Sequence, residues 1–399
     1  MSRRAYLARS AAAAATFTIV PRHVLGGPGQ TPPSEEVRGA LIGCGGQGGS
    51  TFNCLGPGVK KVAQCDVRFR DKADDKEFYT DFRRVLDRDD IDVVAVATHP
   101  GWHALISIAA MESGKDVVCE KPMCRFISEG RAVAEAEKRY GRVFQIEKKS
   151  DVRTRQRKIF ASGLLKQCDS VLITKGGFKL GQWSGSGTYP VAPVPASLDW
   201  DMYCGPAPLR PFSPARLGGV HRRWWDYDGG GLGDMATHHI HGPALAFGRD
   251  LTHPVEIVPH APPAHPEAAG MWGWCELKYA DGFTWVLVSG EWGPEYDRLQ
   301  PRHTDEKDLL EMLGDEGRRK LKELPDPEPL PMFPEAIRTR QRTGSNAERS
   351  HHVAAVFHLA NCAFRCGRTL KFDPVSEQIV GDEEANRLVN QPMRAPWRL

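Results

Sequence analysis

Three residues have the types and spacing needed to act on a hydroxyl group: Lys121, Asp234 and His238. Asp234 and His238 are four positions apart, so on a helix their side chains would share one face. A carboxylate beside an imidazole orients the ring and raises its proton affinity, which suits a general base near neutral pH. A lysine ammonium can stabilise negative charge that develops on a reacting oxygen. The plainer interpretation is an exposed lysine and a helix-surface ion pair.

A glycine-rich turn offers a binding site to go with these groups. An apolar strand expected over residues 37–42 leads into a GxGxxG motif, which consists of Gly43, Cys44, Gly45, Gly46, Gln47 and Gly48. In such a motif the first glycine permits the tight turn, the second lets backbone approach a pyrophosphate, and the third allows close helix–strand packing. The N-terminus of the following helix adds N–H donors. The motif therefore predicts a dinucleotide site.

Asp66 indicates which dinucleotide is bound. It ends a second expected strand, residues 62–65, eighteen residues after Gly48, where a carboxylate is placed to accept hydrogen bonds from a ribose 2′-hydroxyl. The same carboxylate would repel a 2′-phosphate, so NAD is the expected cofactor. Arg68 and Arg70 could reach such a phosphate and keep NADP open. Only twelve residues separate Asp66 from Tyr79, too few for a full crossover helix, so we expect an open adenosine side.

Alternating strands and helices must position these groups. Further strands are expected at 93–97, 116–119 and 143–146, with helices at 102–113 and 128–140. The run at 93–97 is continuously apolar, as in a parallel strand covered on both faces. This alternation predicts an α/β fold that begins with a doubly wound parallel sheet. Ligands of such sheets gather beyond the carboxyl ends of the strands, where Thr98 and Lys121 lie.

The second half is less regular. A helix is expected at 152–162, a strand at 170–174, and a hairpin whose strands, 271–277 and 283–288, flank a turn at 280–282. The long Gly/Pro/Trp-rich stretch 176–223 is typical of a functional or a disordered loop. Its end and the helix beyond supply candidate substrate contacts: Arg223, Trp224, Trp225 and His239. Core packing of the two tryptophans and a solvated charged rim are the alternatives.

Composition excludes several classes of protein. The 399 residues are 41% hydrophobic and 26% charged, close to globular averages. Four of the basic residues that make the net charge +3 are arginines of the first thirty residues, so the body is near neutral and lacks the basic footprint of nucleic-acid binding. Ten cysteines without a CxxC predict neither a disulfide scaffold nor a zinc ribbon. No HExxH motif accompanies His238, His239 and His241, so no metal site is expected.

The N-terminus reads as a targeting segment. Arg3 and Arg4 precede an apolar run, residues 11–20, that is too short to span a bilayer. This pattern is typical of a twin-arginine export signal over residues 1–30, and it predicts a periplasmic or otherwise exported protein without stable membrane insertion. A disordered basic tail is the alternative. Twin-arginine export carries folded proteins, which agrees with cysteines that need not pair.

The motifs together resemble the Gfo/Idh/MocA oxidoreductases. The resemblance rests on Thr98 followed by Trp102 and His103, on Glu120-Lys121-Pro122, on residues 229–239, and on the C-terminal stretches 381–386 and 394–397. It implies a Rossmann domain over 31–150 and, over 151–399, an α/β domain whose open, mostly antiparallel sheet carries the substrate face and often the oligomer interface. It also implies that Thr98, Trp102, His103, Glu120 and Lys121 contact the cofactor and that Lys121, Asp234 and His238 form the catalytic group.

Two activities and one inactive class follow from this resemblance. The first is a periplasmic oxidoreductase that moves a hydride between a sugar or polyol and a tightly held cofactor, as a homodimer or homotetramer. The second is a glycosidase that oxidises a sugar carbon transiently, lets elimination and hydration cleave the bond, and reduces the carbon again. A non-enzymatic sugar-binding protein would leave the catalytic residues idle. The retained Glu120-Lys121-Pro122 favours the oxidoreductase, whereas the sugar itself cannot be read from the sequence.

Overall fold

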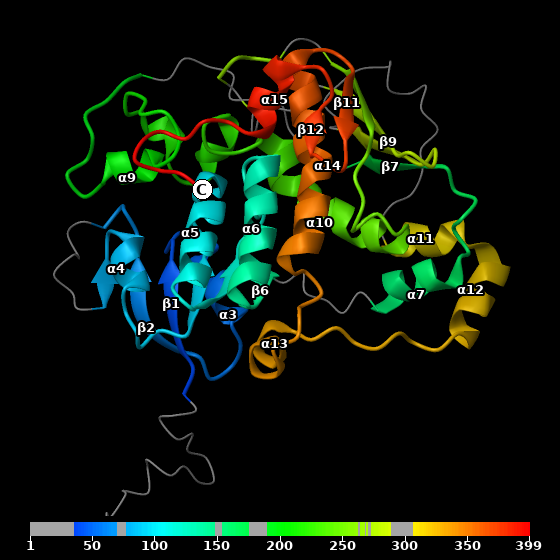
Figure 1. Cartoon of the computed structure of the whole chain (residues 1–399), viewed down its shortest axis with the longest axis horizontal. Helices are drawn as coiled ribbons and strands as arrows, with labels where there is room; N and C mark the ends of the chain where they lie inside the picture. The colour runs from blue at the N-terminus through cyan, green and yellow to red at the C-terminus, as the bar shows by residue number, and fades with distance from the viewer. Residues whose placement is uncertain are drawn as a thin grey trace, which may run out of the picture.

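The computed structural model describes residues 36–69, 77–147, 154–174, 190–261, 264–267, 269, 273–288 and 306–399, apart from the side chains of residues 174, 234–236 and 306. The expected signal segment, 1–30, and most of the shortened crossover after Asp66 lie outside these residues. Two sheets organise the described part of the chain, and Figure 1 shows them as separate bodies joined by long helices.

The first sheet is parallel throughout. Its six described strands run in the order β3-β2-β1-β4-β5-β6. Their bounds are β1 Arg38–Ile42, β2 Lys60–Cys65, β3 Phe78–Tyr79, β4 Val93–Val96, β5 Asp116–Cys119 and β6 Phe144–Ile146. Every residue of β4 and β5 is buried, which for β4 agrees with the prediction from its continuous apolar run. Because chain order reverses direction beside β1, the carboxyl ends of β1 and β4 face a shared crevice.

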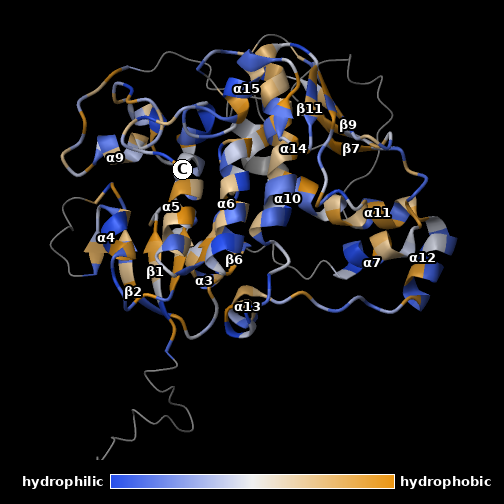
Figure 2. Ribbon diagram, viewed as in Figure 1, coloured by the Kyte–Doolittle hydropathy of each residue, from blue (hydrophilic) through white to orange (hydrophobic). Residues whose placement is uncertain are grey.

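Helices cover this sheet and complete the Rossmann unit. They are α3 Gly48–Asn53, α4 Phe82–Leu86, α5 Pro100–Glu112 and α6 Ile127–Tyr140. Figure 1 shows α5 and α6 side by side in front of the strands, where they pack against each other. Figure 2 shows hydrophobic colour on the strands β1 and β2, which these helices shield from solvent. The expected helix bounds 102–113 and 128–140 agree with α5 and α6 to within two residues.

The second sheet is mixed and mostly antiparallel. Its order is β12-β11-β8-β9-β10-β7, with β10 and β7 forming the parallel pair. The bounds are β7 Ser170–Thr174, β8 Glu256–His260, β9 Trp274–Lys278, β10 Thr284–Val288, β11 Leu370–Asp373 and β12 Gln378–Ile379. The turn at Gly282, whose φ is +89°, closes the predicted β9–β10 hairpin. The predicted fold class, a Rossmann sheet followed by an α/β domain with a mostly antiparallel sheet, is confirmed.

Two long helices connect the sheets. α14, Ala347–Cys366, packs against α6 of the first unit and against α10, Gly230–Ala246, of the second. Asn346 caps the N-terminus of α14 by accepting the backbone N–H of Arg349, and Gly367 ends it in the left-handed region. Most of α14 is buried, so it is a shared core element rather than a surface helix.

The remaining segments are short. They are α7 Thr154–Ser162, α9 Trp200–Cys204, the 3₁₀ turns η3 Pro214–Arg216 and η4 Gly218–Arg223, α11 Glu306–Met312, α12 Gly314–Glu323, α13 Phe333–Thr339 and α15 Glu383–Val389. The predicted irregular stretch 176–223 is thus partly ordered from residue 190 onward. In the described part of the chain, no helix has the length and apolar character to cross a membrane.

Candidate active site

The glycine-rich turn has the shape of a phosphate cradle. Gly43 follows β1 with φ +93°, and a Cβ there would lie 2.5 Å from the backbone of Ala97 on the neighbouring strand. A Cβ on Gly48 would meet the Gly43 carbonyl oxygen at 2.5 Å. At Gly46, by contrast, a Cβ would meet nothing within 4 Å, because that glycine faces open space in front of α3. The turn therefore fits a pyrophosphate, since its backbone is bare where the ligand would lie.

Asp66 lies where the ribose was expected, but its carboxylate is already engaged. Oδ1 accepts the backbone N–H and Nε–H of Arg68, both at 3.0 Å. Oδ2 accepts from Arg68 at 2.8 Å and from the Cys44 backbone N–H at 2.9 Å. The Asp66 hydrogen bonds raise the pKa of the Arg68 guanidinium, which stays charged. Arg68 thus lies across the adenosine end of the site, with Asp66 beneath it.

Lys121 follows β5 and is buried although its side chain is cationic. Its neighbour Glu120 accepts a hydrogen bond of 3.1 Å from the Thr51 hydroxyl on α3. This contact ties the Glu120-Lys121 turn to the helix that begins at the glycine-rich motif. The predicted phosphate cradle and the predicted charged group are therefore held by one packed unit.

The side chains of His103 and Trp102 make hydrogen bonds that link the backbone segments around the site. The buried His103 ring places Nδ1 2.6 Å from the Pro122 carbonyl oxygen and Nε2 3.0 Å from that of Thr98, so it bridges the chain after β5 and after β4. Burial lowers the pKa of His103 to about 4, which keeps the ring neutral. Trp102 donates its Nε1–H to the Met202 carbonyl oxygen at 2.9 Å. Both residues position the backbone around the site.

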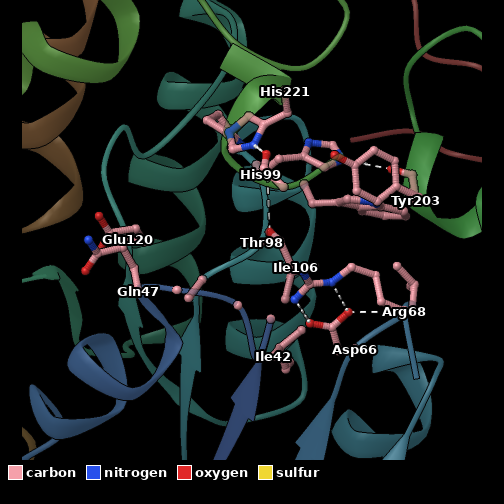
Figure 3. Close-up of a pocket in the computed structure, with 18 of the residues that line it drawn as sticks. Ile42, Gln47, Asp66, Arg68, Thr98, His99, Ile106, Glu120, Tyr203 and His221 are labelled. Carbon is pink, nitrogen blue, oxygen red and sulfur yellow. Dashed lines mark hydrogen bonds and ion pairs between the residues drawn. The ribbon is translucent and has the colours of Figure 1, made fainter. Parts of the chain in front are cut away.

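A cavity of about 390 Å³ joins these elements. The predicted cofactor residues that line it are Gly43, Gly45, Gly46, Gln47, Asp66, Thr98, Trp102, Glu120 and Lys121, whereas Gly48 and His103 lie outside its wall. Figure 3 shows Asp66 with Arg68 at one end, Gln47 and Glu120 along one side, and His221 with His99 at the other end. This order of lining residues suits an adenosine, a pyrophosphate and a reacting group placed one after another.

The second domain closes the cavity with residues that the sequence analysis did not select. Tyr203 comes from α9, His221 from η4, and Asp228 from the turn before α10. His99 comes from the first domain, with Nε2 2.8 Å from the Tyr203 carbonyl oxygen. Burial, with the neighbouring His221, lowers the pKa of His99 to about 3. No motif spacing marks these residues, because they lie on short helical turns or in the segments that join longer elements.

Of the predicted catalytic residues on α10, the structure describes the side chain of His238 but not that of Asp234. The side chain of Asp234 lies outside what the structure describes, so the Asp234–His238 contact stays a prediction. His238 and His239 are half-buried on α10, and neither lines the cavity. Their helix nevertheless begins two residues after Asp228, which does line it.

The predicted aromatic substrate contacts lie in the protein core. Trp224 is 5% exposed, packs among the residues of α9 and η3, and donates Nε1–H to the Ala215 carbonyl oxygen. Trp225 is 3% exposed, and its Nε1–H donates to the His265 carbonyl oxygen. Neither these tryptophans nor Arg223 line the cavity. This placement favours core packing for both rings, the alternative that the sequence left open.

One histidine cluster lies apart from this cavity. The Nε2 atoms of His253 and His351 are 3.0 and 2.8 Å from Glu377 Oε1, a spacing that a metal could use. Arg131 also contacts that oxygen, at 2.7 Å. A guanidinium at that position already neutralises the carboxylate and repels a cation, so the cluster is better described as a buried hydrogen-bond hub.

The architecture and the cradle define a nucleotide-binding α/β protein, and comparison with known proteins gives the family. A family model described as "Oxidoreductase family, NAD-binding Rossmann fold" matches residues 38–148, and one described as "Oxidoreductase family, C-terminal alpha/beta domain" matches residues 149–399. The chain belongs to the Gfo/Idh/MocA oxidoreductase family, and its N-terminal domain is an NAD-binding Rossmann domain. The predicted family, enzyme class and cofactor are confirmed.

Curated relatives match over short stretches. A glycosyl hydrolase family 109 protein of Solibacter usitatus is 35% identical over 116 residues, which is 24% of this chain and 26% of that protein. A levoglucosan dehydrogenase of Pseudarthrobacter phenanthrenivorans is 46% identical over 59 residues, 15% of each chain. The matched stretch thus spans about a quarter or less of these relatives.

Solved structures match over most of the chain. Myo-inositol 2-dehydrogenase from Lactobacillus plantarum superposes with a TM-score of 0.51 at 16% identity, covering 84% of this chain and 99% of that one. Aldose-aldose oxidoreductase from Caulobacter crescentus gives a TM-score of 0.50 at 17% identity, covering 84% and 100%. At these identities the likeness shows the shared fold.

Proposed function

We propose that this protein is an NAD-dependent oxidoreductase that transfers a hydride between a hydroxyl-bearing carbon of a sugar or polyol and NAD. The observation that carries the proposal is that Lys121 lines the same cavity as the bare glycine turn and Asp66. A cation is thereby placed in the wall of the cavity that the glycine turn and Asp66 also line. Relatives and fold neighbours named as sugar dehydrogenases support a carbohydrate substrate.

Different residues of the chain bind the cofactor and act on the substrate. Bound NAD would supply the hydride-accepting nicotinamide ring. The turn from Gly43 to Gly48 holds the pyrophosphate, and Asp66 accepts from the ribose. The ammonium of Lys121 donates to the substrate oxygen and stabilises the alkoxide that develops as the hydride leaves. The family resemblance assigns the base to His238, oriented by Asp234, and this assignment is one of two alternatives for the base, because His238 does not line the cavity.

The proposal extends to the setting of the enzyme. The paired Arg3 and Arg4 support export to the periplasm by the twin-arginine route. Outside the cytoplasm no soluble nicotinamide pool recycles the cofactor, so we expect tight retention and a second substrate that reoxidises it. The resemblance also supports a homodimer or homotetramer through the second sheet, which light scattering on the purified protein would measure.

A cofactor-cycling glycosidase is the second candidate. It is favoured by the stretch shared with family 109 glycosyl hydrolases and with an alpha-N-acetylgalactosaminidase of Shewanella oneidensis, which is 34% identical over 115 residues and covers a quarter of each chain. Oxidation, elimination, hydration and re-reduction would use the same cradle and Lys121. The two candidates differ in whether the sugar product is oxidised or cleaved.

The experiment combines nucleotide release with a substrate panel. Acid treatment of purified protein should release NAD, identified by mass. Adding myo-inositol, levoglucosan or glucose to the NAD⁺-loaded enzyme should raise absorbance at 340 nm. 4-Nitrophenyl N-acetyl-α-galactosaminide reports cleavage, and release of nitrophenol without net reduction would select the glycosidase. A protein that neither carries nor binds NAD or NADP would contradict both candidates.

A further inference from the structure

A histidine and an aspartate of the second domain face each other across the far end of the cofactor cavity. His221 Nε2 lies 3.5 Å from Asp228 Oδ2, and both residues line the cavity with Lys121 and Thr98. Neither belongs to the group that the family resemblance assigned. Since the proposed function puts adenosine and pyrophosphate at the Asp66 and glycine-turn end, the reacting ring and the substrate would lie at this end.

The two residues are held rigidly. Asp228 is fully buried, and its Oδ1 accepts the Gly229 backbone N–H at 2.6 Å at the start of α10. A Cβ on Gly233 would come within 3.1 Å of the same oxygen, so the carboxylate rests against the first turn of the helix, where the helix dipole favours negative charge. Asn361 of α14 fixes Gly229 by donating to its carbonyl oxygen at 3.0 Å.

The hydrogen bonds also set the state of the imidazole. His221 Nδ1 faces the Gly218 carbonyl oxygen at hydrogen-bond distance. A neutral ring therefore carries its proton on Nδ1 and presents a lone pair at Nε2. Asp228 Oδ2 is buried without a hydrogen-bond partner in the part of the chain that the structure describes. Two lone pairs then face each other, and one added proton would turn this contact into an ion pair.

Resting on the proposed function, we propose that His221 is the group that takes the proton of the substrate hydroxyl, with Asp228 as the residue that positions and stabilises its protonated form. In alcohol oxidation the carbon–hydrogen bond breaks and its electron pair leaves with the hydrogen as hydride to the nicotinamide. The oxygen–hydrogen bond breaks and its proton goes to His221 Nε2, leaving a carbonyl product. The reverse reaction returns both.

Other charged groups facing the pair must be considered. His99 adjoins the His221 ring at 6.0 Å between centroids, but burial holds its pKa at about 3, so it stays neutral and cannot act as the base. Lys121 and Arg222 line the same cavity, and the Asp228 carboxylate also interacts electrostatically with the buried guanidinium of Arg125. All three of these side chains are cations, so they complement the charge of the Asp228 carboxylate.

Nitrogen NMR of the histidines tests the pair without a known substrate. In ¹⁵N-histidine-labelled protein, Asp228→Asn should shift the Nε2 resonance of His221, because the anion 3.5 Å from that nitrogen is gone. Asp201→Asn, the same change at an exposed carboxylate, should leave the resonance in place. Saturating NAD⁺ should shift the His221 Nε2 resonance more than NADH does, since the oxidised ring carries a positive charge. A His221 Nε2 resonance that is insensitive to Asp228, or equal in the two cofactor states, overturns the inference.

The kinetics of variants show whether the His221–Asp228 pair or the Asp234–His238 pair on α10 supplies the base. On a sugar that reduces bound NAD⁺, His221→Gln should lower single-turnover hydride transfer about 10² to 10⁴-fold while NAD⁺ affinity stays within threefold. Asp228→Asn should lower it less and shift the acid limb of the pH profile. Wild-type rates in His221→Gln, with the loss appearing in His238→Gln instead, would refute the assignment. If the wild-type enzyme binds NAD⁺ but reduces it with no sugar, the proposed function fails while the NMR measurement still decides the pair.

Discussion

The contacts of Asp66 bear on whether the adenosine end of the cavity prefers NAD or NADP. Arg68 binds both carboxylate oxygens and lies beside Gly45, whose Cβ would come within 3.1 Å of the guanidinium. The acid therefore holds Arg68 in place, and in the proposed function it also offers oxygens to the ribose. Sequence spacing predicted the first role, whereas the second needs the fold of the chain after β2.

Replacing this carboxylate should change cofactor preference. Asp66→Ala removes the ribose acceptor and frees Arg68, so NAD binding should weaken about 10- to 100-fold, the range for a hydrogen bond to a charged group. NADP binding should weaken less, because the released guanidinium can pair with the 2′-phosphate. Calorimetric titration of both dinucleotides measures the ratio, with Arg68→Ala as the control that removes the cation alone. Equal losses for both cofactors would count against this reading of Asp66.

Residues without motif spacing were the ones missed at the site. Lys121 and Thr98 could be predicted because each follows a continuous apolar strand. His221 and Asp228 lie seven positions apart in a segment with no regular period, and tertiary packing alone brings them to the cavity. The sequence indicated Trp224 and Trp225 as candidate substrate contacts, whereas both are core residues in the structure.

At the scale of elements, the turn needs glycine for two different reasons, backbone geometry and room for a ligand. Single substitutions can separate the two. Gly43 is required by backbone geometry, since a Cβ would clash with Ala97. Gly46 faces open space, so a side chain there conflicts with a ligand rather than with the fold. GxGxxG spacing alone does not reveal this difference.

A matched pair of alanine variants tests the cradle. Gly46→Ala should leave the melting temperature within about 2 °C of wild type while weakening NAD binding at least tenfold, because the new methyl group fills the phosphate position. Gly49→Ala, also without a neighbour within 4 Å, should change neither property. Thermal unfolding and fluorescence titration give both readings. Unchanged NAD affinity in Gly46→Ala would show that the pyrophosphate lies elsewhere.

Helix α14 makes stability depend on pH. His358 is buried with Nε2 3.2 Å from the Cys124 carbonyl oxygen, and burial lowers its pKa to about 3. The unfolded chain takes up this proton near pH 6.5, so the contribution of His358 is present above that pH and is lost as the pH falls toward 3. Glu129 and Glu137, whose pKa values burial raises to about 7, act in the opposite sense.

Comparing how the unfolding free energy of the wild type and of His358→Gln changes with pH separates the contribution of the histidine from that of these carboxyl groups. Between pH 7 and pH 5, wild-type protein should lose about 2 kcal/mol more unfolding free energy than His358→Gln, since a tenfold change in proton affinity corresponds to about 1.4 kcal/mol. Urea unfolding at the two pH values measures the difference. Parallel losses in the two proteins would mean that His358 is not held neutral.

For the whole molecule, the alternation of strands and helices predicted the first sheet, while the second was predicted only in part. β7 and the β9–β10 hairpin have clear apolar runs and a turn signal. β8, β11, β12 and β3 are short or partly exposed, and their pairing depends on strands distant in sequence, as β11 with β8 shows. No disulfide joins the ten cysteines, which all lie among the described residues.

Export can be tested through the paired arginines. Arg3→Lys combined with Arg4→Lys should leave folded, NAD-containing protein in the cytoplasm, because the export machinery reads the pair. Arg9→Lys combined with Arg22→Lys makes the same kind of change outside the pair and should be exported normally. Cell fractionation followed by immunoblotting gives the distribution. Normal periplasmic recovery of the first double variant would rule out the twin-arginine route.

Transfer of a carbon-bound hydrogen to NAD is the most direct test of the central claim. Sugars deuterated at carbon, among them myo-inositol and levoglucosan, are mixed with NAD⁺-loaded enzyme, and the released nucleotide is analysed by mass spectrometry. We predict deuterium in the nucleotide of the wild-type enzyme and none in Lys121→Ala, although both proteins bind NAD⁺. Conversion of a sugar with no deuterium in the nucleotide, or equal labelling in Lys121→Ala, would contradict the account.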